Sequence, residues 1–257
     1  MTVTSRFGPP AAAVLGLLAL WEAAVRVANA DPILLPGPAR ILQALWEFRD
    51  DALRHLVPTL VETLVGLAIS LAFAIAVASA LDRVAWLRRA VEPLLVTSQT
   101  IPIVAVAPLF VLWFGFGLAP KVIVVVLVTF FPIVVASLDG FRSAPAEASD
   151  LLRSYGAGEG QTFRLLRWPV ALPGLFTGLR IAAVYAVIGA VFGEYVGATD
   201  GLGIWMQLSQ NAFRTDLVFA AILLSALVSI ALHGAVALGE RLVIPWSPRI
   251  RSGIVAH

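Results

Sequence analysis

Long apolar segments recur along the whole chain, and they limit its possible folds more than any other feature. A helix that crosses the roughly 30 Å hydrocarbon core of a bilayer needs about 20 apolar residues. Candidate segments of this kind lie near residues 10–29, 56–81, 93–117, 120–140, 171–196 and 217–240. Each is bounded by charges, proline or glycine. This pattern predicts an all-α, polytopic membrane protein with about six transmembrane helices in a single domain over residues 1–257.

The composition agrees with a membrane location and excludes several kinds of chemistry. Hydrophobic residues make up 60% of the chain and charged residues 13%, whereas soluble domains carry about 25% charged residues. The absence of cysteine excludes disulfides, zinc–thiolate sites and thiol nucleophiles. The three histidines are too far apart in sequence to suggest a metal site. We therefore expect no catalytic site, no metal and no nucleic-acid partner.

The distribution of basic residues predicts the orientation. Lysine and arginine accumulate on the cytoplasmic side of membrane proteins. With both termini in the cytoplasm, twelve of the eighteen basic residues fall inside and six outside. The first segment, preceded by Arg6, also resembles a signal peptide. It lacks a clear cleavage site, and we expect it to be retained as the first span.

The segment 142–169, here named the coupling loop, differs from a simple connection. Pro145 or Ser149 can start a short helix, and Gly156 can end it in a left-handed cap. A second short helix is expected over 159–167, after which Pro169 and Pro173 are expected to break the chain before the fifth span. Helix, glycine turn, helix and proline predict a compact projection that could insert into a groove on a partner.

This loop resembles the signature of the permease subunits of ATP-binding-cassette importers. That signature has an acidic residue, a glycine six positions later and a Leu-Pro pair ending thirteen positions after the glycine. Asp150, Gly156 and Pro169 match this spacing, and Phe163 stands at the usual aromatic position. The chain departs from the pattern where Leu151-Leu152 replace two alanines and Trp168 replaces the leucine.

The resemblance covers about residues 34–246 and points to one branch of these permeases. Leu35-Pro36-Gly37-Pro38, the stretch 101–117 and Phe131-Pro132-Ile133-Val134 look like the nitrate/sulfonate/taurine branch. So do residues 173–180 and 201–203. Within that branch, residues 185–197 look most like members assigned to pyrimidine precursors of thiamine.

The resemblance implies an assembly and a mechanism. Two permease copies, expected to be a homodimer, would form the pathway in the bacterial inner membrane. Two cytoplasmic ATPase subunits would bind ATP and Mg, and an extracytoplasmic binding protein would deliver the solute. This chain has no phosphate-binding loop of the type Gly-x-x-x-x-Gly-Lys-Ser/Thr, so no cofactor is expected on it. Asp150 and Gly156 would seat the coupling helix, Phe163 would pack in or behind it, and Pro169 would fix the angle to the fifth span.

Polar residues inside apolar spans are costly and therefore suggest function. Gln99, Tyr185 and Glu194 are the candidates for the solute pathway, with helix packing or an interhelical hydrogen bond as the alternative for each. Glu62 and Glu194 are expected near the outer surface, where a solvated carboxylate costs little. Glycines of the fifth span, with Gly189 and Gly193 in a Gly-x-x-x-Gly pattern, predict close helix packing within the chain or between two copies.

Two other classes of function remain as alternatives. A membrane enzyme would need a reactive cluster within the spans, and His233, the one histidine in a span, has no suitable partner in the sequence. A secondary transporter that needs no ATPase commonly has internal repeats, and none is evident here. The sequence does not name the solute. Few cations lie in the outer halves of the spans, which slightly favours a neutral heterocycle over a sulfonate.

Overall fold

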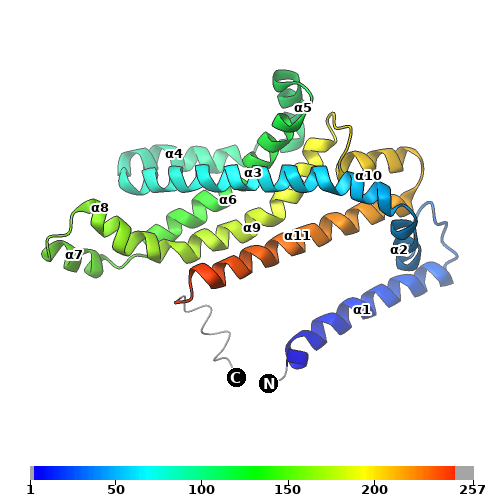
Figure 1. Ribbon diagram of the computed structural model, residues 1–257, viewed down its shortest axis with the longest axis horizontal. Coiled ribbons are helices and arrows are strands. Elements are labelled where there is room, and N and C mark those ends of the chain that lie inside the picture. Colours follow the sequence, from blue (N-terminus) through cyan, green and yellow to red (C-terminus); the bar gives the residue numbers. More distant parts are fainter. Residues whose placement is uncertain (1–2, 247–257) are drawn as a thin grey trace. The chain divides into compact units, whose positions relative to one another are not determined.

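The computed structural model describes residues 3–246. Within that range it holds eleven α-helices, one π-helical turn and no strand (Figure 1). Contacts between Cα atoms divide the chain into two compact units, residues 1–58 with 199–226 and residues 59–198 with 227–257. Arg249, Arg251 and the C-terminus, all used in the orientation argument, lie outside the described residues.

The expected spans correspond to helices, with one exception. The first, second, fourth, fifth and sixth are α1 (Val3–Val27), α3 (Arg49–Arg83), α6 (Leu118–Arg142), α9 (Trp168–Glu194) and α11 (Thr215–Val243). Four of these helices are long and apolar enough to cross a membrane, namely α3, α6, α9 with the turns before it, and α11. The all-α, polytopic prediction is thus confirmed.

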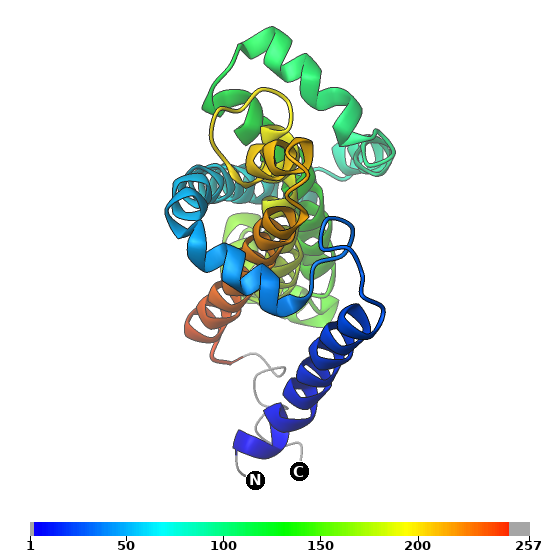
Figure 2. The ribbon, with the colours of Figure 1, turned by 90° about the vertical axis from the view of Figure 1, so that its right-hand side faces the viewer.

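The expected third span, residues 93–117, is not one helix. It consists of the end of α4 (Ala85–Ser98), a non-helical connection, and α5 (Ile103–Phe114). Pro102 stands at the N-cap of α5, where it cannot supply the backbone N–H that a continuous helix would need. Figures 1 and 2 show α5 leaving α4 at a sharp bend. The shorter α5 leads into α6 through Gly115 and Gly117, whose φ angles of +73° and +140° suit glycine.

The first unit contains α1, α2 (Pro38–Glu47) and α10 (Leu202–Asn211), together with the start of α3 and of α11. Pro38 is in the first turn of α2, where its missing N–H has no partner to lose. The amphipathic pattern of that helix places Ile41 and Ala44 inside. Such local rules account for the start and for the buried face of this short helix.

The core of the second unit lies between α6 and α9, which run side by side (Figure 1). Four glycines of α9 allow this approach, because a Cβ added to any of them would lie 3.0 Å or less from an atom of α6. They are Gly174, Gly178, Gly189 and Gly193. The Gly-x-x-x-Gly pair is therefore used in packing within the chain.

Candidate functional site: the coupling loop and a mid-span cavity

The coupling loop forms the predicted helix, glycine turn and second helix. Its first helix, α7 (Ala146–Ser154), begins after Pro145 and carries Glu147 in its first turn. Gly156 follows the end of α7 with φ +84°, and its backbone N–H donates to the carbonyl of Arg153 over 2.9 Å. A side chain would meet nothing within 4 Å here. Glycine is therefore needed for its conformation, not for space.

The expected break at Pro169 and Pro173 is wrong. The chain runs from α8 (Glu159–Thr162) through the π-helical turn Phe163–Arg167 directly into α9. Pro169 lies in the first turn of α9. The N–H of Trp168 bonds to the carbonyl of Phe163, five residues back, so the wider π turn accommodates the arrival of the proline without ending the helix.

Phe163 packs behind the loop against the membrane helices. Its ring centroid lies 5.5 Å from that of Phe141 and 6.3 Å from that of Trp168. The guanidinium of Arg83, at the end of α3, lies 4.5 Å from the Phe163 ring centroid. A cation over an aromatic face is attracted to its electrons. This arrangement joins the loop to α3, α6 and α9.

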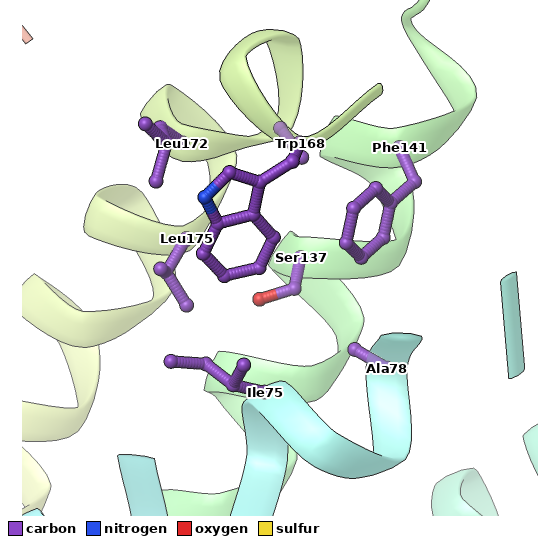
Figure 3. A pocket seen from close by; sticks show the side chains of 8 residues that line it. Ile75, Ala78, Ser137, Phe141, Trp168, Leu172 and Leu175 are labelled. Carbon is purple, nitrogen blue, oxygen red and sulfur yellow. The ribbon is translucent and has the colours of Figure 1, made fainter. Parts of the chain in front are cut away.

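The base of the loop is densely packed around Trp168. Figure 3 shows the Trp168 indole directed toward Ser137 and Phe141 of α6, with Leu172 and Leu175 beside it. The remaining space there is only about 10 Å³, and its lining is apolar apart from Ser137. The Ser137 hydroxyl donates to the carbonyl of Ile133 over 2.6 Å. A void of this size, with no free polar partner, is a packed joint and not a ligand site.

Ion pairs join the loop and the helix ends around it. Arg167 contacts Asp82 at 2.9 Å, and Arg142 contacts Glu92 at 2.5 Å. On the loop itself, Arg153 lies 2.6 Å from Glu159 and 3.8 Å from Asp150. The sequence gives no sign of the first two pairs, since their members are 85 and 50 residues apart.

The tip of the loop remains open. The side chain of Asp150 is 75% exposed, and the apolar side chains of Leu151 and Tyr155 are exposed as well. Exposed large apolar groups beside charges are typical of a surface that contacts another protein. The loop thus has a packed base and an exposed apolar tip.

A second feature is an open cavity of about 630 Å³ in the second unit. It is lined by the α4–α5 connection, the start of α5, the middle of α6 and Tyr185 of α9. Two of the three predicted pathway residues, Gln99 and Tyr185, lie in its wall. None of the described lining residues is charged.

Glu194, the third predicted pathway residue, lies elsewhere. It is fully buried and accepts a hydrogen bond from the Thr59 hydroxyl at 2.5 Å. Glu62 is also buried, with 2% exposure, and its carboxylate lies 2.6 Å from the Lys121 ammonium. The expectation that both glutamates lie at a wet surface is therefore wrong. The sequence did contain a sign of this burial. Each carboxyl group lies within an apolar span, and Lys121 lies in another apolar span.

These features define a class of protein: a helical membrane protein in which a loop with a turn at a glycine connects two closely packed helices. Its residues 68–244 match the model of the binding-protein-dependent transport system inner membrane component family. The chain belongs to this family and is a permease subunit of ATP-binding-cassette importers. The described residues contain no group of three or more metal-ligating side chains.

Several named relatives align with nearly the whole chain. The formylaminopyrimidine transport permease ThiX of Halalkalibacterium halodurans is 40% identical over 90% of this chain and 93% of its own. The riboflavin transport permease RibX of Chloroflexus aurantiacus is 39% identical, covering 90% and 87%. The taurine transport permease TauC of Escherichia coli is 28% identical, covering 91% and 88%.

A solved structure is similar in fold. A chain of the MetNI methionine transporter in an inward-facing conformation aligns with a TM-score of 0.61 and 21% identity. The alignment covers 75% of this chain and 97% of that chain. The relatives agree with the predicted family and with its nitrate/sulfonate/taurine branch and thiamine-precursor type, and the solved structure agrees with the predicted fold.

Proposed function

We propose that this chain forms the pathway of a bacterial importer and that residues 142–169 dock into a partner ATPase. The observation that carries the proposal is the exposed tip of the loop, held on a packed base formed by Phe163 and Trp168. Asp150 and Gly156 would seat the coupling helix in the partner, and the π-helical turn would transmit its movement to α9. Two copies of the chain, two ATPase subunits that bind ATP and Mg, and an extracytoplasmic binding protein complete the assembly.

The orientation proposed for this importer places both termini and the coupling loop in the cytoplasm of a bacterial cell. The excess of basic residues on that side supports it. In the same proposal the ATPase activity belongs to the partner, and this chain converts the partner's movement into access from alternate sides.

The solute that we propose is a small, uncharged nitrogen heterocycle. The relatives named for formylaminopyrimidine and riboflavin share 40% and 39% of their residues with this chain, against 28% for the one named for taurine. The uncharged lining of the cavity at Tyr185 agrees with this choice, since a sulfonate would favour a cation in a site of low polarity. Transport of a taurine-like sulfonate is the second candidate.

Docking is tested by substitutions of Gly156. Because φ +84° is unfavourable for a side chain, Gly156→Ala costs about 1–2 kcal/mol in the loop conformation. We expect about tenfold less ATPase to co-purify with the permease at limiting partner concentration. Gly156→Pro, which also removes the N–H bonded to Arg153, should abolish co-purification.

The matched control is Gly160→Ala, in α8 of the same loop, where an added Cβ also meets nothing within 4 Å and φ is not positive. It should bind ATPase as the unaltered chain does, because alanine is favourable in a helix. Equal co-purification of the Gly156 variants in correctly inserted protein would contradict the docking role. Solute transport by the purified chain without ATPase would favour a secondary transporter instead.

The solute is tested by uptake into proteoliposomes that contain the assembled transporter and its binding protein. We expect ATP-dependent uptake of a radiolabelled 4-aminopyrimidine or of riboflavin, and no uptake of taurine above the rate without ATP. Uptake of taurine alone would overturn the heterocycle and leave the importer in place. If the assembled complex takes up none of the three, this solute assignment fails.

A further inference from the structure

We infer that the cavity at Tyr185 is a solute-binding site of the permease itself, selective for flat, uncharged heteroaromatic molecules. The inference rests on the proposed function and deepens it, since a permease whose pathway merely passes a preselected molecule needs no such site. Four observations support it: the depth of the cavity, its broken backbone, its free polar groups and its lack of charge.

The cavity lies near the middle of the membrane-spanning helices. Its α6 wall consists of Leu127, Val128, Phe131 and Pro132, in a helix that begins at Leu118. At 1.5 Å per residue these positions lie about 14–21 Å from the start of the helix. A hydrocarbon core of about 30 Å therefore has its midplane at this level.

The opposite wall of the cavity is formed where the helical backbone is interrupted between α4 and α5. Residues 99–102 separate α4 from α5 and are not helical, and Gln99, Ile101 and Pro102 line the cavity. Lipid offers no partners to open backbone groups, so irregular backbone at membrane depth occurs where it is buried in protein or faces a water-filled space. The interrupted backbone therefore indicates that this wall is covered by protein or faces a water-filled space, and that it does not face lipid chains.

Two side chains in this wall have hydrogen-bonding groups that no other described residue engages. The amide of Gln99 supplies two donors and an acceptor, and the Tyr185 hydroxyl supplies one of each. Ser98, by contrast, already donates to the carbonyl of Leu95 over 2.7 Å. Polar groups without a hydrogen-bond partner at this depth are costly, so their presence indicates that they bind a ligand.

The chemistry of the lining indicates the ligand class. Phe131 and Tyr185 offer two aromatic rings, and the other walls are aliphatic apart from Ser98 and Gln99. An amide pairs with the donor and acceptor edge of an aminopyrimidine or a flavin, as amides do with adenine. A charged solute would lose its hydration without gaining a counter-ion. A volume of about 630 Å³ lies within the range of small-molecule sites, about 300–1,000 Å³.

The test measures binding to the assembled transporter in lipid nanodiscs, without nucleotide and without the binding protein. The probes are riboflavin, followed by quenching of its fluorescence, and a 4-aminopyrimidine and taurine as competitors. We expect saturable riboflavin binding that the aminopyrimidine displaces and taurine does not. Gln99→Ala should weaken riboflavin binding about tenfold, because the hydrogen-bond donors and the acceptor of the amide are lost.

Tyr185 supplies a graded pair of variants. Tyr185→Ala removes the ring, and loss of one aromatic contact to a heterocycle lowers affinity about tenfold or more. Tyr185→Phe keeps the ring and should lower affinity only a few-fold. Ile188→Ala is the control, since this exposed residue lies three positions further along α9 and outside the cavity. It should bind riboflavin as the unaltered transporter does.

The outcomes separate this inference from the proposed function. If ATP-dependent uptake is observed but riboflavin and the aminopyrimidine show no saturable binding without the binding protein, the site is absent and the importer stands. Binding that Gln99→Ala and Tyr185→Ala leave unchanged would also overturn the inference. Failure of the complex to form would instead contradict the docking proposal.

Discussion

Lys121→Met is expected to lower the free energy of unfolding by about 3–5 kcal/mol, as loss of one partner of a buried ion pair does. Lys121 is 9% exposed and its ammonium lies 2.6 Å from the carboxylate of Glu62, which is 2% exposed. The Glu62 carboxyl group also interacts with the buried carboxyl group of Glu194. Without the lysine, Glu62 must stay charged in an apolar surrounding or take up a proton, and both are unfavourable.

The measurement is SDS-induced unfolding of the detergent-solubilised protein, followed by circular dichroism. The double variant Lys121→Met with Glu62→Gln should recover part of the loss, since position 62 then carries no charge while the buried carboxyl group of Glu194 remains. Arg49→Met is the control: its pair with Asp50 is 3.9 Å long and both side chains are exposed, so the change should stay within about 1 kcal/mol. If the Lys121 variant is as stable as the unaltered protein, the ion pair between Lys121 and Glu62 does not stabilise the packing of α3 against α6.

Gly178→Ala is expected to destabilise the packing of α6 against α9 by about 1–3 kcal/mol or more. An added Cβ would lie 2.5 Å from the backbone oxygen of Pro132 and 2.9 Å from the Cα of Ile133. Backbone atoms cannot rotate away as a side chain does, so the two helices must separate. The two helices contribute to the apolar core of the unit, which includes Ile133 and Ala182 at 0% exposure.

Gly234→Ala, in α11 of the same unit, is the matched control because an added Cβ there meets nothing within 4 Å. Alanine in an unobstructed helix is favourable by roughly 0.5–1 kcal/mol, so this variant should melt at the same or a higher temperature. Scanning fluorimetry of the tryptophans compares the two. If Gly178→Ala melts no lower than Gly234→Ala, the close approach of α6 and α9 is not needed for stability.

Local features of the sequence predicted much of the candidate site. The spacing of Asp150, Gly156 and Pro169 placed the loop, and the left-handed cap followed from a glycine at the end of a short polar helix. Gln99 and Tyr185 stood out as polar residues in apolar segments, and the cavity contains both. The same criterion did not separate these from Glu194, which has a buried hydrogen bond to Thr59 instead.

The errors came from local rules applied without their surroundings. Pro102 interrupts a segment long enough to span the membrane, so hydropathy alone joined α4 and α5 into one helix. Pro169 and Pro173 gave the opposite error. Pro169 follows a π-helical turn and lies in the first turn of α9, and Pro173 lies inside α9, which continues past both. The effect of a proline depends on which carbonyl would lose its partner, and that is a property of the folded backbone.

The sequence by itself determined that this chain is a helical membrane protein, where five of the six expected spans lie and which loop carries the turn at Gly156. Hydropathy over about 20 residues and the conformation of single glycines are short-range properties, and a sequence displays them directly. Only the tertiary structure decided that Lys121 reaches Glu62, that the glycines of α9 face α6, and that Gln99 and Tyr185 share a cavity. These contacts join distant segments, and they depend on how each helix is rotated and inclined against its neighbours, which the pattern along any one helix leaves open.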